Sequence, residues 1–201
     1  MNENNVELNL YHDCLYELQR RINVIYDHLN GKTHEQYKII EVETLCLQFR
    51  KVLEKIALMS LVANKDAYAQ QNEKFARHYH AERILNDLER INPDFYPKPI
   101  RRIRREDGVY DFTPLTEGFL TKDEFVQIYE KCGGMLHAQN PFNTQKDIDA
   151  INALFPVWIT KISVLLNEHV MTLTDSNVII AAIMKRSDNG LPQAVIFEPV
   201  D

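Results

Sequence analysis

One stretch limits what this chain can fold into more than any other, and it runs from Glu41 to Asn64 as EVETLCLQFRKVLEKIALMSLVAN. Its apolar residues recur at the three- and four-residue spacing of an α-helix. One side carries Val42, Leu45, Phe49, Val52, Leu53, Ile56 and Met59, and a second side carries Leu47, Ala57 and Leu61. A helix that is apolar on most sides must be covered by other elements. The sequence therefore predicts that this helix lies at the centre of a bundle.

Three charged residues interrupt this apolar run on one stripe of the predicted helix. Glu43, Arg50 and Glu54 are seven and four residues apart, which places them on the same side. Charges in apolar surroundings cost free energy unless they are paired or bind something. Two interpretations stay open: a structural ion pair between Arg50 and Glu54, and a polar site in which Arg50 holds a phosphate or carboxylate while Glu54 orients it.

An earlier helix is predicted over Val6–Leu29, where apolar residues alternate in steps of three and four along one seam. Asn30-Gly31 is a typical helix end. Thr33 and Gln36 have the spacing of a capping box that would start the central helix a few residues later. Because the connection is short, we expect the first two helices to form an antiparallel pair.

Three later segments are predicted to complete the bundle. They are residues 80–91, a helix that starts at a Thr121–Glu124 capping box and ends near His137, and a helix from Thr144 to Glu168. Pro156 falls inside the last of these and is expected to bend it, because proline removes one backbone hydrogen bond.

Strand signals occupy two regions. Ile100–Pro114 is typical of a β-hairpin, and a two-residue turn at Asp107-Gly108 would set Ile103 opposite Phe112. The last part of the chain, rich in β-branched residues and broken by two polar turns, predicts a three-stranded antiparallel meander. The sequence leaves open whether the hairpin joins that sheet.

The expected fold is therefore mainly α, with an antiparallel helical bundle of about five helices, a β-hairpin insert and a small C-terminal antiparallel β-meander. Residues 1–168 would form the bundle, with the hairpin inserted at about 99–114. Residues 169–201 would form the meander, packed on the bundle as part of a single domain overall.

Composition favours a cytoplasmic protein without a membrane segment. The chain starts without a basic segment followed by an apolar one, and the apolar runs Ile56–Ala63 and Val178–Met184 are far shorter than the roughly 20 residues that span a bilayer. Its three cysteines are widely spaced, which suits reduced thiols. Phosphate-loop, dinucleotide-binding, hydrolase and zinc motifs are absent, so we expect no metal and no cofactor.

Two further groups are candidate site residues. His137 stands in KCGGMLHAQNPF near a predicted helix end, where it would act either as an acid or base near neutral pH or as a packing or capping residue. A basic cluster lies on the predicted hairpin. Its members are Arg101, Arg102, Arg104 and Arg105. This cluster would bind a nucleic-acid backbone or another partner, or would form a solvated edge that prevents aggregation of strands.

The segments LCLQFRKVLEKIALMSLVAN and YEKCGGMLHAQNPF, on two long predicted helices, resemble HEPN-like helical proteins of prokaryotes over roughly Val6 to Leu166. The resemblance implies a helical bundle, a homodimer and a place in a defence or toxin-type system. Active members of that family are metal-independent ribonucleases with an Arg followed a few residues later by a His on one helix. Here Arg50 is followed by Glu54, and His137 lies on another predicted helix, so only Arg50 carries over.

Two functional hypotheses follow. The first is a non-catalytic, dimeric helical module that binds a macromolecular partner, either RNA or a protein, through its bundle face or its hairpin. The second is a metal-independent ribonuclease or nucleotide-acting enzyme in which Arg50 holds phosphate, His137 moves a proton and Glu54 sets the geometry. The enzyme requires Arg50 and His137 to reach one substrate in a concave, wet site.

Overall fold

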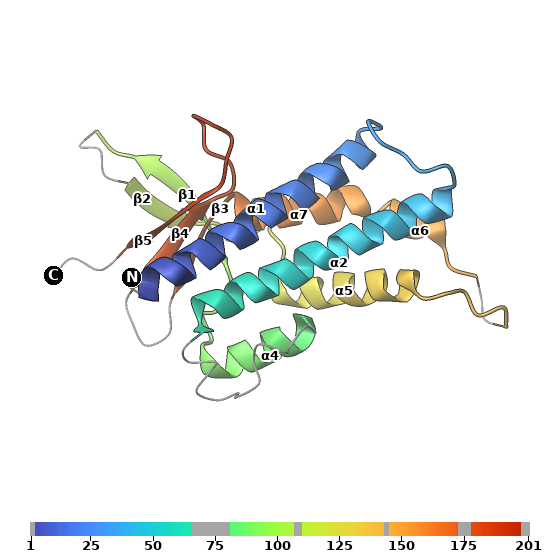
Figure 1. Cartoon of the computed structure of the whole chain (residues 1–201), viewed down its shortest axis with the longest axis horizontal. Helices are drawn as coiled ribbons and strands as arrows, with labels where there is room; N and C mark the ends of the chain where they lie inside the picture. Colours follow the sequence, from blue (N-terminus) through green and yellow to red (C-terminus); the bar gives the residue numbers. More distant parts are fainter. Residues whose placement is uncertain (1–2, 66–80, 107–109, 143–144, 173–177, 198–201) are drawn as a thin grey trace.

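The structure of the protein is a computed structural model, and it describes residues 3–65, 81–106, 110–142, 145–172 and 178–197. Helices gather at one end of an elongated molecule and a β-sheet lies at the other (Figure 1). The predicted turns at Asp107-Gly108 and at Asp175-Ser176-Asn177, and the helix start at Thr144, lie outside the described residues.

Helix α2 (Lys38–Ala63) is the central element, as the sequence predicts. It runs antiparallel beside α1 (Glu3–Leu29) and also contacts α4 (Ala81–Ile91), α5 (Lys122–Leu136) and α6 (Ile148–Asn152) (Figure 1). Aromatic side chains fill the core beside it: Phe49 stacks on Phe155 at 5.3 Å between ring centroids and meets Trp158 edge-on at 5.6 Å. Burial on several sides explains why this helix is apolar nearly all round.

The two capping boxes expected from the sequence have different outcomes. Thr121 accepts a hydrogen bond from the Glu124 backbone N–H, and the Glu124 carboxylate accepts one from the Thr121 N–H, so the box that starts α5 is confirmed. The predicted capping box at Thr33 and Gln36 is wrong. Helix α2 begins at Lys38 after Tyr37, whose side chain makes no capping bond. The motif has the right spacing but lies too far before the first helical turn.

The expected helix from Thr144 to Glu168 is not bent but divided. Its described parts are α6 and α7 (Phe155–Asn167), and Pro156 occupies the first turn of α7. Proline is tolerated there because the first backbone N–H groups of a helix have no partner within it. Helix α6 is capped by the Asp147 carboxylate, which accepts a hydrogen bond of 2.9 Å from the Ala150 N–H.

By length and composition alone, the 20-residue stretch Ile148–Asn167 is apolar enough to cross a membrane, and the sequence analysis did not identify it. In the fold the stretch is divided between α6 and α7. The side chains that α7 buries in the core are Phe155, Trp158, Ile159, Ile162, Leu165 and Leu166. Core packing accounts for these six side chains only, because 28% of the apolar window is buried and α6 buries no side chain.

Hairpin and meander belong to one five-stranded antiparallel sheet of order β2-β1-β3-β4-β5. The strands are β1 (Lys98–Arg104), β2 (Tyr110–Pro114), β3 (Glu168–Thr172), β4 (Ile179–Ile183) and β5 (Gln193–Phe197). The hairpin joins the meander through two residue pairs, Lys98 with Val170 and Pro99 with His169. The fold class predicted from the sequence, mainly helical with a hairpin and a C-terminal meander, is confirmed.

The hairpin register differs from the sequence prediction by one residue. Arg102, not Ile103, lies opposite Phe112. A shift of one residue moves every side chain to the other face of a strand. The observed register puts buried Ile100 on the same face as Phe112 and leaves Ile103 51% exposed on the other. Burial of Ile100 therefore favours the observed register over the register that a two-residue turn would impose, in which Ile103 lies opposite Phe112.

Side chains alternate between the two faces of the sheet. On β4, Ile180 and Ala182 are buried toward the helices, while Ala181 and Ile183 point to the opposite face. Helices α1 and α7 cover the inner face. The outer face of the sheet is thus left without a covering helix among the described residues.

Candidate functional site

Arg50 lies between α2 and α5, held against Tyr129. Its Nη2 donates a 2.7 Å hydrogen bond to the Tyr129 hydroxyl, and its guanidinium lies 3.9 Å from the Tyr129 ring centroid. Gly133, one turn further along α5, makes room for it: a Cβ on that residue would stand 2.6 Å from Arg50 Nη1. The missing side chain of Gly133 therefore leaves the space that the Arg50 guanidinium occupies.

Glu54 completes this group of side chains. It lies 3.6 Å from Arg50 and 2.8 Å from Lys51, and it accepts a hydrogen bond of 3.4 Å from the Tyr129 hydroxyl. The Arg50 and Glu54 side chains are only 23% and 18% exposed. Burial raises the pKa of Tyr129, while the charge of Arg50 opposes that rise. Arg50 and Glu54 thus pair with each other and with Tyr129, while Glu43, the third charged residue of the stripe, is half-buried and outside these contacts.

His137 stands apart from that group. It is the exposed residue that ends α5, and its backbone carbonyl accepts a hydrogen bond from Lys146. No contact described for the chain joins His137 to Arg50, and neither residue, nor Glu54, lines any of five well-formed pockets in the described part of the chain. The structure brings Arg50 and Glu54 together and leaves His137 outside.

The four arginines of the basic cluster are exposed on β1 and at its end. Arg102 forms an ion pair of 3.5 Å with Glu168 and lies 4.6 Å from the Tyr110 ring centroid. Arg105 lies 3.7 Å from Asp111. Arg101 points to the other face, and Arg104 shares the face of Arg102 because strand residues alternate. Half of the cluster is therefore balanced by carboxylates.

A cavity of about 210 Å³ opens on the outer face of the sheet. We name it the sheet cavity. Its lining residues are Ile100, Arg102, Tyr110, Phe112, Glu168, Ala181, Ala182, Ile183, Gln193, Val195 and Phe197. The outermost strands of the sheet curl toward each other, since the rings of Phe112 on β2 and Phe197 on β5 meet edge-on at 5.7 Å. The lining is mostly apolar, and its polar members stand among those apolar side chains.

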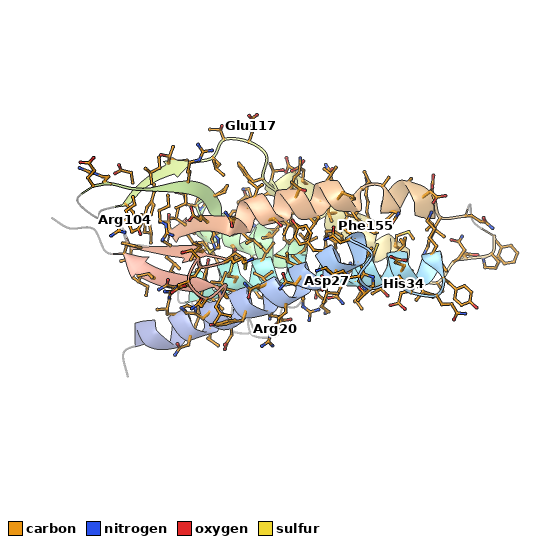
Figure 2. The ribbon with its side chains drawn as sticks, turned by 90° about the horizontal axis from the view of Figure 1, so that it is seen from above. Arg20, Asp27, His34, Arg104, Glu117 and Phe155 are labelled. Atoms are coloured by element: carbon orange, nitrogen blue, oxygen red, sulfur yellow. The ribbon has the colours of Figure 1, made fainter. Side chains whose placement is uncertain are left out.

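The sheet cavity lies beyond the bundle. Figure 2 shows Arg104 at the hairpin end of the molecule and His34 near the far end of the helices. At the cavity itself, the Glu168 carboxylate accepts a 3.1 Å hydrogen bond from the Arg102 backbone N–H. The same carboxylate forms the ion pair with the Arg102 guanidinium. This double contact fixes the direction of β1 where it leaves β3.

The two outer edges of the sheet are not equivalent. Helix α1 shields β5: His12 accepts a hydrogen bond from the Ala194 N–H, and Gln19 donates to the carbonyl of Gly190. On β2, no described strand or helix pairs with the edge opposite β1. Leu115 N–H bonds to Pro99 C=O at 2.9 Å, and bonded pairs alternate along an antiparallel ladder. The N–H and C=O groups of Tyr110 and Phe112 therefore point away from β1.

Comparison of the chain with protein-family models, with curated proteins and with solved structures finds no match. The resemblance to HEPN-like proteins therefore stays a prediction. Among the described residues, no three His, Cys, Asp or Glu side chains gather to hold a metal ion. What the chain does must be argued from the geometry of the Arg50 group and of the sheet cavity.

One polar pair escaped the sequence analysis. Tyr11 and His169 are fully buried, and the Tyr11 hydroxyl lies 2.8 Å from His169 Nε2. His169 Nδ1 lies 3.1 Å from the Leu166 carbonyl, and burial lowers the pKa of His169 to about 4. The imidazole is thus neutral at pH 7, with a structural role of joining α1 to β3. The alternating strand EHVMT, which puts His169 beside Met171, was the available signal.

Proposed function

We propose that this protein is a non-catalytic binding module and that its macromolecular partner is a protein, which docks at the sheet cavity. The observation that carries the proposal is the cavity itself. An apolar cavity of roughly 150 Å³ holds a benzene molecule, so a volume of about 210 Å³ suits one large apolar side chain. Such a pocket, filled by one anchor residue, is typical of the best-bound part of a protein interface.

A protein partner fits the surface better than RNA. RNA binding depends on cations that are free to contact phosphates and on aromatic rings that are free to stack on bases. Here Arg102 is paired with Glu168 and lies over the Tyr110 ring, and Arg105 lies beside Asp111. The lining is mostly apolar, and its one arginine, Arg102, is already paired.

The ribonuclease hypothesis has less support. Its phosphate-binding residue would be Arg50, whose guanidinium is committed to Tyr129 and Glu54. Its proton-transferring residue would be His137, which lies outside this group. Substrate binding would have to break the contacts of Arg50 first. The expected homodimer, the cytoplasmic location and a role in a prokaryotic defence or toxin-type system stay predictions.

The proposal can be tested with a random 12-residue peptide library displayed on phage and selected on the wild-type protein. Ala181→Phe would fill the cavity, because Ala181 lines it. Ala138→Phe adds the same side chain at an exposed position outside every pocket described. We expect selected peptides to bind the wild type and Ala138→Phe equally, and to bind Ala181→Phe at least tenfold more weakly.

Two results would overturn the proposal. One is a library from which no peptide is enriched, or whose peptides bind Ala181→Phe as well as the wild type. The other is cleavage of a mixed RNA pool by the wild type that is lost in both Arg50→Ala and His137→Ala. That second result would establish the enzyme in place of the binding module.

A further inference from the structure

We infer that the partner segment is an extended acidic peptide that pairs with the free edge of β2 and inserts one apolar side chain into the sheet cavity. This inference rests on the proposed function and adds the binding mode and the chemistry of the ligand. It starts from the backbone of β2. Tyr110 and Phe112 direct their N–H and C=O groups outward, and no described strand takes them up.

An unpaired strand edge is a template for another strand, and peptides commonly bind proteins in this way. The edge of β5 is less suited, because α1 lies beside it and His12 bonds the Ala194 N–H. The edge of β2 carries proline only at its end, at Pro114. Two consecutive outward-facing residues, Tyr110 and Phe112, can therefore offer up to four backbone hydrogen bonds to an added strand.

Strand geometry then determines where the peptide side chains go. The residue that exchanges hydrogen bonds with Phe112 lies directly opposite it, so its side chain points to the same face of the sheet. That face holds the sheet cavity, where Phe112 meets Phe197. An apolar residue at this position of the peptide would enter the cavity, and its neighbours in the sequence would point the other way.

Charge selects the remaining residues of the peptide. Strand β1 and its end carry Lys98 and the four arginines of the basic cluster, whereas β2 carries Asp111 alone. Carboxylates balance Arg102 and Arg105, while no ion pair is described for Arg101, which lies on the face to which the side chains next to the inserted apolar residue would point. A peptide that alternates apolar and acidic residues complements this surface, since electrostatic matching favours the partner of opposite charge.

The experiment uses a synthetic peptide, acetyl-Glu-Val-Glu-Phe-Glu-Val-Glu-amide, and the full chain. Binding is measured by isothermal titration calorimetry, and the amides of Tyr110 and Phe112 are followed by hydrogen exchange. N-methylation of the central Phe removes the N–H that would bond to β2, while N-methylation of the next Glu removes one that would point away. We expect the first change to weaken binding at least tenfold and the second to leave it within about twofold.

Charge gives a second measurement on the same complex. Arg101→Glu should weaken binding of the acidic peptide at least tenfold, whereas Arg104→Glu, on the cavity face, should weaken it less. A peptide with Lys in place of every Glu should prefer the Arg101→Glu variant to the wild type. Absence of binding at 1 mM peptide, unprotected Tyr110 and Phe112 amides in the complex, or equal effects of the two N-methyl groups would each overturn the inference. If library peptides still lose affinity with Ala181→Phe, the proposed function survives that failure.

Discussion

Replacing Gly133 with alanine should destabilise the wild-type protein but stabilise a variant in which Arg50 is replaced with alanine. A new Cβ would stand 2.6 Å from Arg50 Nη1, so the guanidinium at the end of this flexible side chain must shift, and loss of both its contacts with Tyr129 sets the upper limit of the cost. The hydrogen bond to the Tyr129 hydroxyl is worth about 1.5–3 kcal/mol for a charged donor. The contact with the ring adds about 0.5–1 kcal/mol at a partly exposed site.

These losses compete with a gain. Alanine is better than glycine by about 1 kcal/mol inside a helix. Arg50 is 23% exposed and can keep its contact with Glu54, which lowers the loss. We therefore expect Gly133→Ala to lower the free energy of unfolding by about 1–2 kcal/mol in the wild type, and to raise it by about 1 kcal/mol in an Arg50→Ala background, where the obstacle is gone.

Urea denaturation followed by circular dichroism measures both values. Gly134→Ala is the matched control, because nothing lies within 4 Å of a Cβ at that position. It should stabilise both backgrounds by the same amount, about 1 kcal/mol. Stabilisation of the wild type by Gly133→Ala, equal to that seen with Arg50→Ala, would show that Arg50 is not held against α5 as described.

Two further predictions concern acid sensitivity and the start of α5. Burial lowers the pKa of His169 from 6.5 to about 4, so the unfolded chain takes up a proton first as the pH falls. The free energy of unfolding should therefore drop by up to about 3 kcal/mol between pH 6.5 and 4. Urea titrations at several pH values measure this drop, and an equal drop in a His169→Phe variant would contradict the prediction. Thr121→Ala removes the acceptor of the Glu124 N–H and should lower the free energy of unfolding by about 1 kcal/mol. Urea denaturation measures this loss, and the control Thr113→Ala, at an exposed position, should lose less than half as much.

Local signals in the sequence predict much of this fold. The apolar run around Phe49 identifies the central helix, and the Thr121–Glu124 box locates the start of α5. Alternating β-branched residues identify the meander. Each of these depends on residues a few positions apart, which is the range over which periodicity and capping chemistry act.

The candidate site could not be predicted in the same way. The sheet cavity depends on contact between Phe112 and Phe197, on the pairing of Pro99 with His169 and on a hairpin register set by burial of Ile100. Each of these joins parts of the chain that are distant in sequence, so a local pattern cannot reveal them. The charged stripe shows the converse: its position was evident, but only the structure shows Tyr129 as its partner.

The contacts between α1 and the C-terminal strands determine how late during synthesis the fold can be completed. Tyr11 contacts His169, 158 residues further along the chain, and His12 contacts Ala194. During synthesis on a ribosome, α1 emerges long before either partner exists. The part of α1 that packs on the sheet must therefore wait for β3 and β5, although its pairing with α2 can form earlier, and folding should be slower than that of a helical bundle of the same length, whose contacts are mostly local.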